Sequence, residues 1–241
     1  MDMKPTTRIE ITAADVDKRG YITPARLTQL MILAAMDRNR TEGGGKGPMR
    51  ENFGAAWMFR RVRMEQFLPI QAGTVLEGFG SGRTMLEAEY VRRGEFRLNG
   101  EVAARCDLVM MPVKLKERAK LTPPEVERLY DCPPSNEVEV FPRLPILPDV
   151  PYKESRKITE ADCDDNAAHF ASHSYAGLVC EETGYWDGPY HMMKLLQMDY
   201  VKECVTGDII KIGMLPQGDG FAVQGVHENG KPCFNAYCAY V

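Results

Sequence analysis

The chain has 241 residues, of which 44% are hydrophobic and 27% are charged, and such values are typical of a globular protein with one large or two small domains. Its formal net charge of −4 disfavours a general nucleic-acid binder, which usually carries a basic surface. No apolar run is long enough to span a bilayer, and the N-terminal residues lack the apolar centre of a signal peptide. We therefore expect a cytoplasmic protein that binds neither nucleic acid nor membrane.

The first predicted helix occupies residues 25–39, after a strand in residues 8–14. Thr23 and Pro24 suit the N-cap and the first helical position. Apolar residues fall on more than one face of this helix, which predicts that it is buried. The glycine-rich segment 42–48 lacks the spacing of a phosphate-binding P-loop, and we interpret it as a mobile loop.

The residues that follow have the character of antiparallel strands. Asn99-Gly100 is the sequence of a type I′ turn, which predicts a hairpin at that point. A buried helix followed by an antiparallel meander makes an α+β unit. The predicted strands lie in residues 57–67, 74–77, 84–91 and 102–113.

Residues 121–151 contain eight of the sixteen prolines. Proline cannot donate to a strand ladder, so this segment is predicted to be an extended linker between two domains. A short helix capped by Thr122 is expected near its start.

The pattern of the first half returns after this linker. The heptapeptides ITAADVD, from Ile11, and ITEADCD, from Ile158, agree at five of seven positions. An Asn-Gly pair recurs at 229–230. Landmarks repeated in the same order predict an internal duplication. The expected domains are residues 1–120 and 152–241, joined by the linker 121–151.

Candidate catalytic residues cluster before a predicted helix in residues 172–182. Asp164, Asn166 and His169 precede this helix, and Glu203 lies on a strand expected to pass nearby. A carboxylate can activate water or attack directly, and an amide or imidazole N–H can stabilise an oxyanion. These residue types suit hydrolysis of an activated acyl group, although Asp and Asn before a helix also serve as ordinary caps.

These residues carry a family resemblance. The run DCDDNAAHFASHSY, residues 162–175, resembles the D-x-D-x-N-x-H-V-N-N-x-x-Y signature of acyl-acyl carrier protein (acyl-ACP) thioesterases. The run YVKECVTGDII, residues 200–210, resembles a later strand of that family, and the similarity extends over nearly the full chain. It implies two tandem hotdog domains, each with a long central helix wrapped by an antiparallel β-sheet.

The resemblance also implies a function. A thioesterase of this family hydrolyses fatty acyl-ACP to free fatty acid and carrier protein, without a metal or other cofactor. Glu203 and Asp164 are implied to activate water or orient the histidine, and Asn166 and His169 to bind the thioester oxygen. Three positions separate Asn166 from His169 where the family has two, so an ungapped alignment instead matches Asp165 to the signature carboxylate and Ala167 to its amide.

The first repeat lacks these groups. Tyr21 stands where the second repeat has His169, and Pro69 where it has Glu203. This half is therefore expected to be catalytically silent and to form the acyl pocket. Cys204 beside Glu203 is expected to pack elsewhere, because adjacent strand residues face opposite sides. The seven cysteines include no CxxC pair, which favours free thiols over disulfides or a zinc site.

Carrier protein is acidic, so a basic face is expected to receive it. The candidates are Arg60, Arg61, Arg63, Arg92, Arg93, Lys114, Lys116, Arg118 and Lys120. Two other functions remain open at this point: an acyl-CoA thioesterase and a non-catalytic hotdog protein that binds acyl chains. The sequence leaves a homodimer and a monomer as alternatives, and it does not set the acyl chain length.

Overall fold

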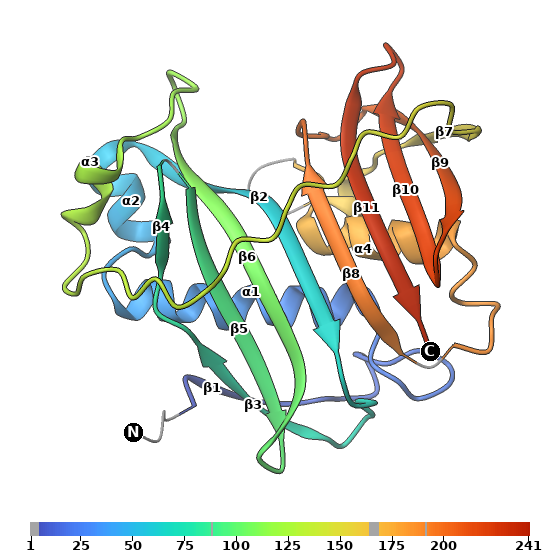
Figure 1. The fold of residues 1–241 in the computed structure, drawn as a ribbon, viewed down its shortest axis with the longest axis horizontal. Coiled ribbons are helices and arrows are strands. Elements are labelled where there is room, and N and C mark those ends of the chain that lie inside the picture. Colours follow the sequence, from blue (N-terminus) through green and yellow to red (C-terminus); the bar gives the residue numbers. More distant parts are fainter. Residues whose placement is uncertain (1–4, 88, 164–168, 191) are drawn as a thin grey trace.

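The computed structural model describes residues 5–87, 89–163, 169–190 and 192–241. One continuous antiparallel sheet dominates it (Figure 1), with the strand order β1-β3-β5-β6-β2-β8-β11-β10-β9-β7 and β4 paired to β5. The strands are β1 (Thr7–Glu10), β2 (Ala55–Gln66), β3 (Val75–Gly80), β4 (Thr84–Leu86), β5 (Glu89–Leu98), β6 (Glu101–Lys114), β7 (Tyr152–Lys157), β8 (Met193–Tyr200), β9 (Ile209–Gln217), β10 (Gly220–His227) and β11 (Pro232–Tyr240). The predicted α+β class is confirmed.

The pairing of β2 with β8 joins the strands of the two halves of the chain into this one sheet. These strands run antiparallel, with Arg61 opposite Asp199 and Met64 opposite Leu196. Strands from the first half of the chain lie on one side of this junction, and strands from the second half lie on the other. A cavity at the junction can therefore be lined by residues far apart in sequence.

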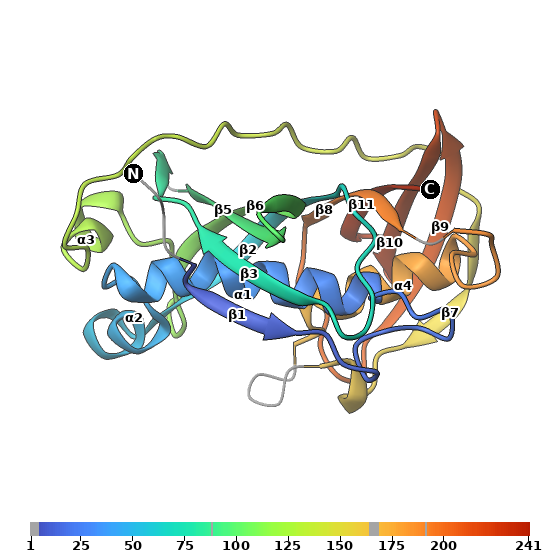
Figure 2. The same cartoon turned by 90° about the horizontal axis from the view of Figure 1, so that it is seen from below.

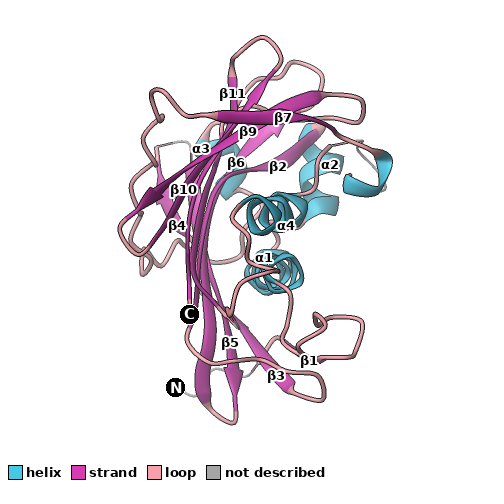
Figure 3. Cartoon of the chain, turned by 90° about the vertical axis from the view of Figure 1, so that its right-hand side faces the viewer, coloured by secondary structure: helices cyan, strands magenta, loops and turns pink. Residues whose placement is uncertain are grey.

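The helices are α1 (Pro24–Thr41), α2 (Lys46–Phe53), α3 (Pro123–Glu127), the short 3₁₀ helix η1 (Glu160–Asp162) and α4 (Ser172–Glu182). Helices α1 and α4 lie side by side on one face of the sheet (Figure 3). Thr23 accepts a hydrogen bond from the Arg26 N–H, and Pro24 opens α1, as the sequence predicts. A Cβ on Gly94 would lie 2.7 Å from the Met31 carbonyl oxygen, so glycine allows β5 to approach α1 closely.

The proline-rich segment crosses the opposite face of the sheet (Figures 1 and 2). Phe141 is buried there with Val91, Val109 and Val138 in a small second core. The Leu144 N–H donates to Asp199 Oδ2 at 2.9 Å. Burial raises the pKa of the Asp199 carboxyl. This segment is thus packed against the junction of β2 and β8.

Equivalent backbone contacts recur in the two halves of the chain. The N–H groups of Ile11 and Ile158 donate to the carbonyls of Thr74 and Asp208, both at 2.8 Å. Farther on, the N–H groups of Ile22 and Phe170 donate to Ile70 and Cys204, again both at 2.8 Å. The second pair aligns Tyr21 with His169 and Pro69 with Glu203, in agreement with the repeat read from the sequence.

Two local predictions are wrong. The alternating run 84–91 is not one strand, because it folds back into β4 and β5, with Leu86 opposite Glu89. Alternation continues through a tight turn, so its period cannot reveal the reversal. The glycine-rich segment 42–48 is not a loop throughout either. Helix α2 begins within it at Lys46, and the Gly44 carbonyl accepts hydrogen bonds from Asn39 and Trp57 at 2.6 and 2.8 Å.

The two Asn-Gly hairpins differ in their backbone. Asn99 and Gly100 have φ values of 51° and 87°, the left-handed pair that a type I′ turn requires. At the second hairpin Gly230 has a φ of 77°, whereas Asn229 is not among the residues with positive φ. Here Asn229 Oδ1 accepts a hydrogen bond from the Lys231 N–H, so the side chain closes a different turn.

Candidate active site

A cavity of about 540 Å³ lies at the junction between the two halves of the chain. Its wall from the first half includes Trp57, Met58 and Phe59 on β2 and Met111 and Val113 on β6. The wall from the second half includes α4 and the segment 201–204 after β8. Apolar side chains along two long strands give this cavity a lining that suits an acyl chain.

His169 and Glu203 lie together at this cavity. The His169 Nδ1 and Glu203 Oε2 atoms are 3.3 Å apart. Nδ1 is buried and makes no aligned hydrogen bond among the described residues, so the contact is a close approach of the two groups. The imidazole side chain as a whole is 39% exposed, which leaves it accessible from the cavity. Catalytic hydrogen bonds often tighten only when substrate binds.

The backbone holds these two residues in place. His169 forms an isolated antiparallel bridge with Val205, and the Phe170 N–H bonds to the Cys204 carbonyl at 2.8 Å. Glu203 directly precedes Cys204 and Val205, which make these contacts. Its position relative to His169 is therefore set by short-range backbone pairing, despite the 34 positions between them in sequence.

The second carboxylate oxygen of Glu203 has a partner from the first half of the chain. Arg118 Nη1 donates to Glu203 Oε1 at 2.6 Å. Arg118 follows β6 and has a left-handed φ of 53°. Its side chain is 72% exposed and that of Glu203 is 30% exposed. The sequence suggested Arg118 only as a docking residue, and no local motif marks its contact with Glu203.

Glu203 does not lie on a strand, contrary to the prediction. Strand β8 ends at Tyr200, and the N–H groups of Val201 and Lys202 both donate to the Cys233 carbonyl, at 2.9 and 3.0 Å. The chain turns there, so strict alternation of side chains ends. As a result Glu203 and Cys204 both line the cavity. The prediction that Cys204 packs away from the cavity is therefore wrong, although the residue is only 1% exposed.

The remaining candidates of the sequence lie outside the described residues. These are Asp164 and Asn166, with the alternatives Asp165 and Ala167. The structure thus brings together His169 and Glu203, whereas the roles of Asp164 and Asn166 stay predictions.

Several arginines proposed for docking are engaged inside the protein. Arg92 is fully buried, with its Nη2 atom 2.6 Å from Glu42 Oε2. Arg61 is buried beside Glu89, at 3.0 Å, and Arg93 pairs with Asp107 at 2.6 Å. Two of the predicted cations, Arg60 and Arg118, line the cavity together with three that were not predicted. We call this set the basic rim: Lys46, Arg50, Arg60, Arg118 and Lys202.

Among the described residues, no helix has both the length and the apolar composition needed to cross a membrane.

No family model matches the sequence, and no curated protein matches it. Solved structures match nearly the whole chain. An acyl-ACP thioesterase from Bacteroides thetaiotaomicron is 14% identical, with a TM-score of 0.83 over 98% of this chain and 96% of that one. A protein described as an oleoyl thioesterase, from Lactobacillus plantarum, is 16% identical, with a TM-score of 0.80 over 97% of this chain and 94% of that one. The 12:0-ACP thioesterase from Umbellularia californica is 16% identical, with a TM-score of 0.80 over 100% of this chain and 99% of that one. The chain therefore has the fold of these three thioesterase structures.

Proposed function

We propose that this chain is a thioesterase that hydrolyses fatty acyl-ACP to free fatty acid and carrier protein. The observation that carries the proposal is the approach of His169 to Glu203, at 3.3 Å, in an apolar cavity. Support comes also from the shared fold, since two of the three similar structures are described as ACP thioesterases. An apolar cavity with one polar end suits a substrate that joins an acyl chain to a polar thioester.

The geometry favours Glu203 as the carboxylate that orients His169. With Glu203 Oε2 facing Nδ1, the neutral imidazole keeps its proton on Nδ1 and leaves the Nε2 lone pair free. Nε2 can then accept a proton from water as the water oxygen attacks the thioester carbonyl. The C–S bond breaks in the collapse of the tetrahedral intermediate, and the departing sulfur takes the proton from Nε2.

Asp164 and Asn166 have complementary roles in this proposal. With Glu203 assigned to the imidazole, Asp164 is the carboxylate proposed to bind the attacking water. The Asn166 amide is proposed to donate to the oxyanion. Both roles rest on the family signature in the sequence.

We further propose two tandem hotdog domains, residues 1–120 and 152–241, joined by the linker 121–151. The repeated backbone contacts at Ile11 and Ile158 support this division. The first domain is proposed to be catalytically silent, since Tyr21 and Pro69 occupy the positions of His169 and Glu203. Its strands β2 and β6 supply apolar walls of the acyl cavity.

A homodimer and a cytoplasmic location remain predictions from the sequence. Light scattering on the purified chain tests the first, and cell fractionation tests the second.

The substrate is tested by turnover of a series of saturated acyl chains, each presented on carrier protein and on CoA. Release of free thiol measures hydrolysis in both series. We expect the higher kcat/KM with acyl-ACP, and a maximum at one range of chain lengths. If every acyl-CoA were hydrolysed faster than the matching acyl-ACP, the substrate would be acyl-CoA. If neither series were hydrolysed, the chain would not be a thioester hydrolase.

A further inference from the structure

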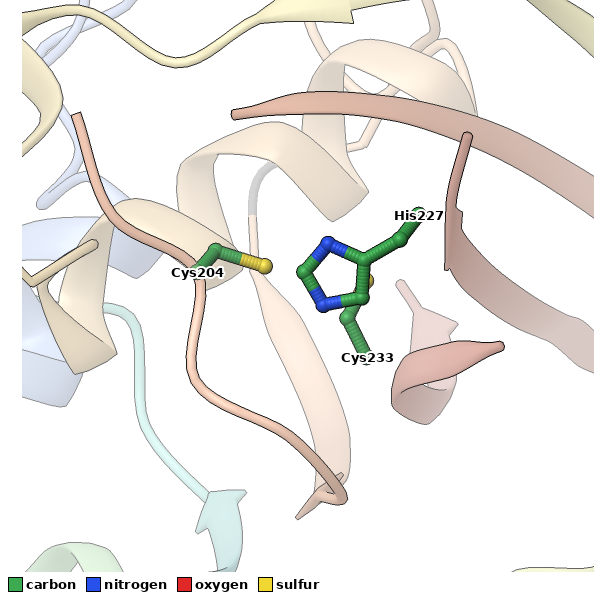
Figure 4. Close-up of side chains that lie close together, drawn as sticks. All are labelled: Cys204, His227 and Cys233. Carbon is green, nitrogen blue, oxygen red and sulfur yellow. The ribbon is translucent and has the colours of Figure 1, made fainter. Parts of the chain in front are cut away.

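Two cysteines and a histidine lie close together (Figure 4), and one of them, Cys204, also lines the candidate active-site cavity. Cys204 follows β8, His227 ends β10 and Cys233 lies on β11. One potential ligand atom from each lies within 4.8 Å of the other two. The cysteines are 1% and 0% exposed, and the His227 side chain is 11% exposed. We call these three residues the Cys₂His cluster.

One ring nitrogen of the histidine in this cluster lacks a hydrogen-bond partner among the described residues. This atom, His227 Nε2, is buried. A buried polar atom without a partner costs free energy, so such an atom calls for an explanation. Its other nitrogen, Nδ1, is 3.8 Å from Asp208 Oδ2, and that oxygen accepts a hydrogen bond from the Val205 N–H at 3.0 Å. A carboxylate facing the second nitrogen is the usual arrangement around a histidine that binds a metal.

Both cysteines of the cluster are available as ligands. All seven cysteines are free thiols, so neither Cys204 nor Cys233 is held in a disulfide. The thiolate is the form of cysteine that binds metals, and a bound cation displaces the thiol protons.

We propose that Cys204, His227 and Cys233 bind one Zn²⁺ ion, with water as the fourth ligand. Sulfur and imidazole ligands select zinc over Mg²⁺ or Ca²⁺. Zinc bonds of about 2.3 Å to sulfur and about 2.0–2.1 Å to nitrogen place tetrahedral ligands about 3.5 Å apart, so small side-chain rotations complete the site. Two thiolates balance the charge of the ion, which lowers the cost of burying it.

A second cavity gives the site access to water. It has a volume of about 470 Å³ and is lined by Lys202, Glu203, Asp208 and His227, among others. No other described His, Cys, Asp or Glu joins the cluster, so a solvent molecule is the natural fourth ligand. Binding releases the two thiol protons to solvent, and the affinity for zinc should therefore rise with pH.

The ligands of this site differ from the proposed catalytic residues, although Cys204 directly follows Glu203 in the chain. The cluster binds the segment after β8 to the β10–β11 hairpin, and its ligands do not include His169 or Glu203. Its spacing resembles no CxxC motif, because the ligands come from three separate segments and meet only in the folded chain.

Metal binding is tested on the purified full chain, stripped with a chelator and kept in a reductant that does not bind metal. Titration with Co²⁺ should produce an intense thiolate-to-cobalt charge-transfer band that saturates at one ion per chain, and Zn²⁺ should abolish it. Elemental analysis after dialysis against zinc should find one ion per chain. No charge-transfer band and no retained zinc would overturn the proposal, as would a Cys204–Cys233 disulfide that persists under reductant.

Substitutions locate the site. Cys233→Ala and His227→Ala should each weaken Co²⁺ binding by at least tenfold, whereas the control Cys180→Ala should bind as the parent does. Cys180 is buried on α4, outside the Cys₂His cluster. Binding unchanged in Cys233→Ala would overturn the assignment. If a variant fails to fold, the charge-transfer band of the parent chain still decides between thiolate ligation and its absence.

Discussion

Glu203 connects the two halves of the chain through its two carboxylate oxygens. Oε2 approaches His169 of the same half, at 3.3 Å, and Oε1 accepts from Arg118 of the other half, at 2.6 Å. The sequence indicated Glu203 and His169 because a signature contains them. It did not indicate the contact of Arg118, since that arginine is 85 residues away and only the folded turn after β6 brings it near.

Arg118 is expected to act by positioning Glu203. In Arg118→Gln the carboxylate loses one of its two partners, and we expect kcat to fall about tenfold, which is about 1.4 kcal/mol in activation free energy. The stability of the fold should hardly change, since the Arg118 side chain is exposed. Steady-state kinetics and urea unfolding measure the two quantities. Lys116→Gln is the matched control, an exposed cation in the same turn, and an equal loss of kcat there would contradict the positioning role.

At the scale of elements, the sequence identified most strands and helices but not their ends. Helix α4 spans Ser172–Glu182, as predicted, because a polar turn precedes it and Gly184 follows it. Helix α2 was missed, because glycine and proline in its first turn conceal a helix that contacts β2 in the folded chain. The Cys₂His cluster was missed because it depends on how three separate segments pack.

The repeated turns at Asp15 and Asp162 are stabilising elements that depend on pH. The backbone N–H of Thr12 donates to Asp15 and lowers the pKa of its carboxyl below the ordinary value of 3.8. A carboxyl whose pKa is lower in the folded chain than in the unfolded chain stabilises the fold at pH values above the unfolded pKa. This stabilisation is lost as the pH falls through the pKa of the folded chain. Asp15→Asn should therefore cost about 1 kcal/mol at pH 7, and distinctly less near pH 3.

Urea unfolding at the two pH values measures this difference. Asp37→Asn is the control, since within the described part of the chain Asp37 pairs only with the exposed Arg40 in the last turns of α1. A cost for Asp15→Asn that stays the same at both pH values would show that its charge is irrelevant.

Zinc should stabilise the segment that contains Cys204. A ligand that binds only the folded chain adds about 2.7 kcal/mol to the free energy of unfolding at one hundred times its Kd. We expect that increase when zinc is added to the stripped chain, and none in Cys233→Ala. Thermal unfolding followed by circular dichroism measures it, and equal stabilisation of the variant would place the zinc elsewhere.

At the scale of the whole molecule, the two halves of the chain share one antiparallel sheet, and helices α1 and α4 lie together on one face of it. The cavity lies where the two halves meet. The duplication could be read from matching landmarks, whereas the pairing of β2 with β8 could not, because neither strand carries a signal for its partner. Predicted basic residues proved to be of two kinds. Arg92 is buried beside Glu42, but Arg118 is exposed on the basic rim.

The basic rim is expected to receive the acidic carrier. Arg50→Glu should raise KM for acyl-ACP about tenfold, and should leave hydrolysis of a small acyl thioester without carrier unchanged, because only docking is affected. Kinetics at low and high salt should show a smaller salt effect in the variant. Arg8→Glu, an exposed cation on the edge strand β1, is the charge-matched control, and an equal rise of KM there would exclude a local docking site.

The central claim is that His169 and Glu203 act as one catalytic unit on the thioester. The most direct measurement is the initial rate of acyl-ACP hydrolysis by His169→Gln, Glu203→Gln and the double variant, each confirmed to be folded by circular dichroism. General acid–base catalysis contributes about 10²–10⁴ in rate, so we expect each single variant to lose a factor in that range. The double variant should be no slower than the slower single variant, because the two groups share one role. Parent-like rates in either single variant, or losses that multiply in the double variant, would contradict the account.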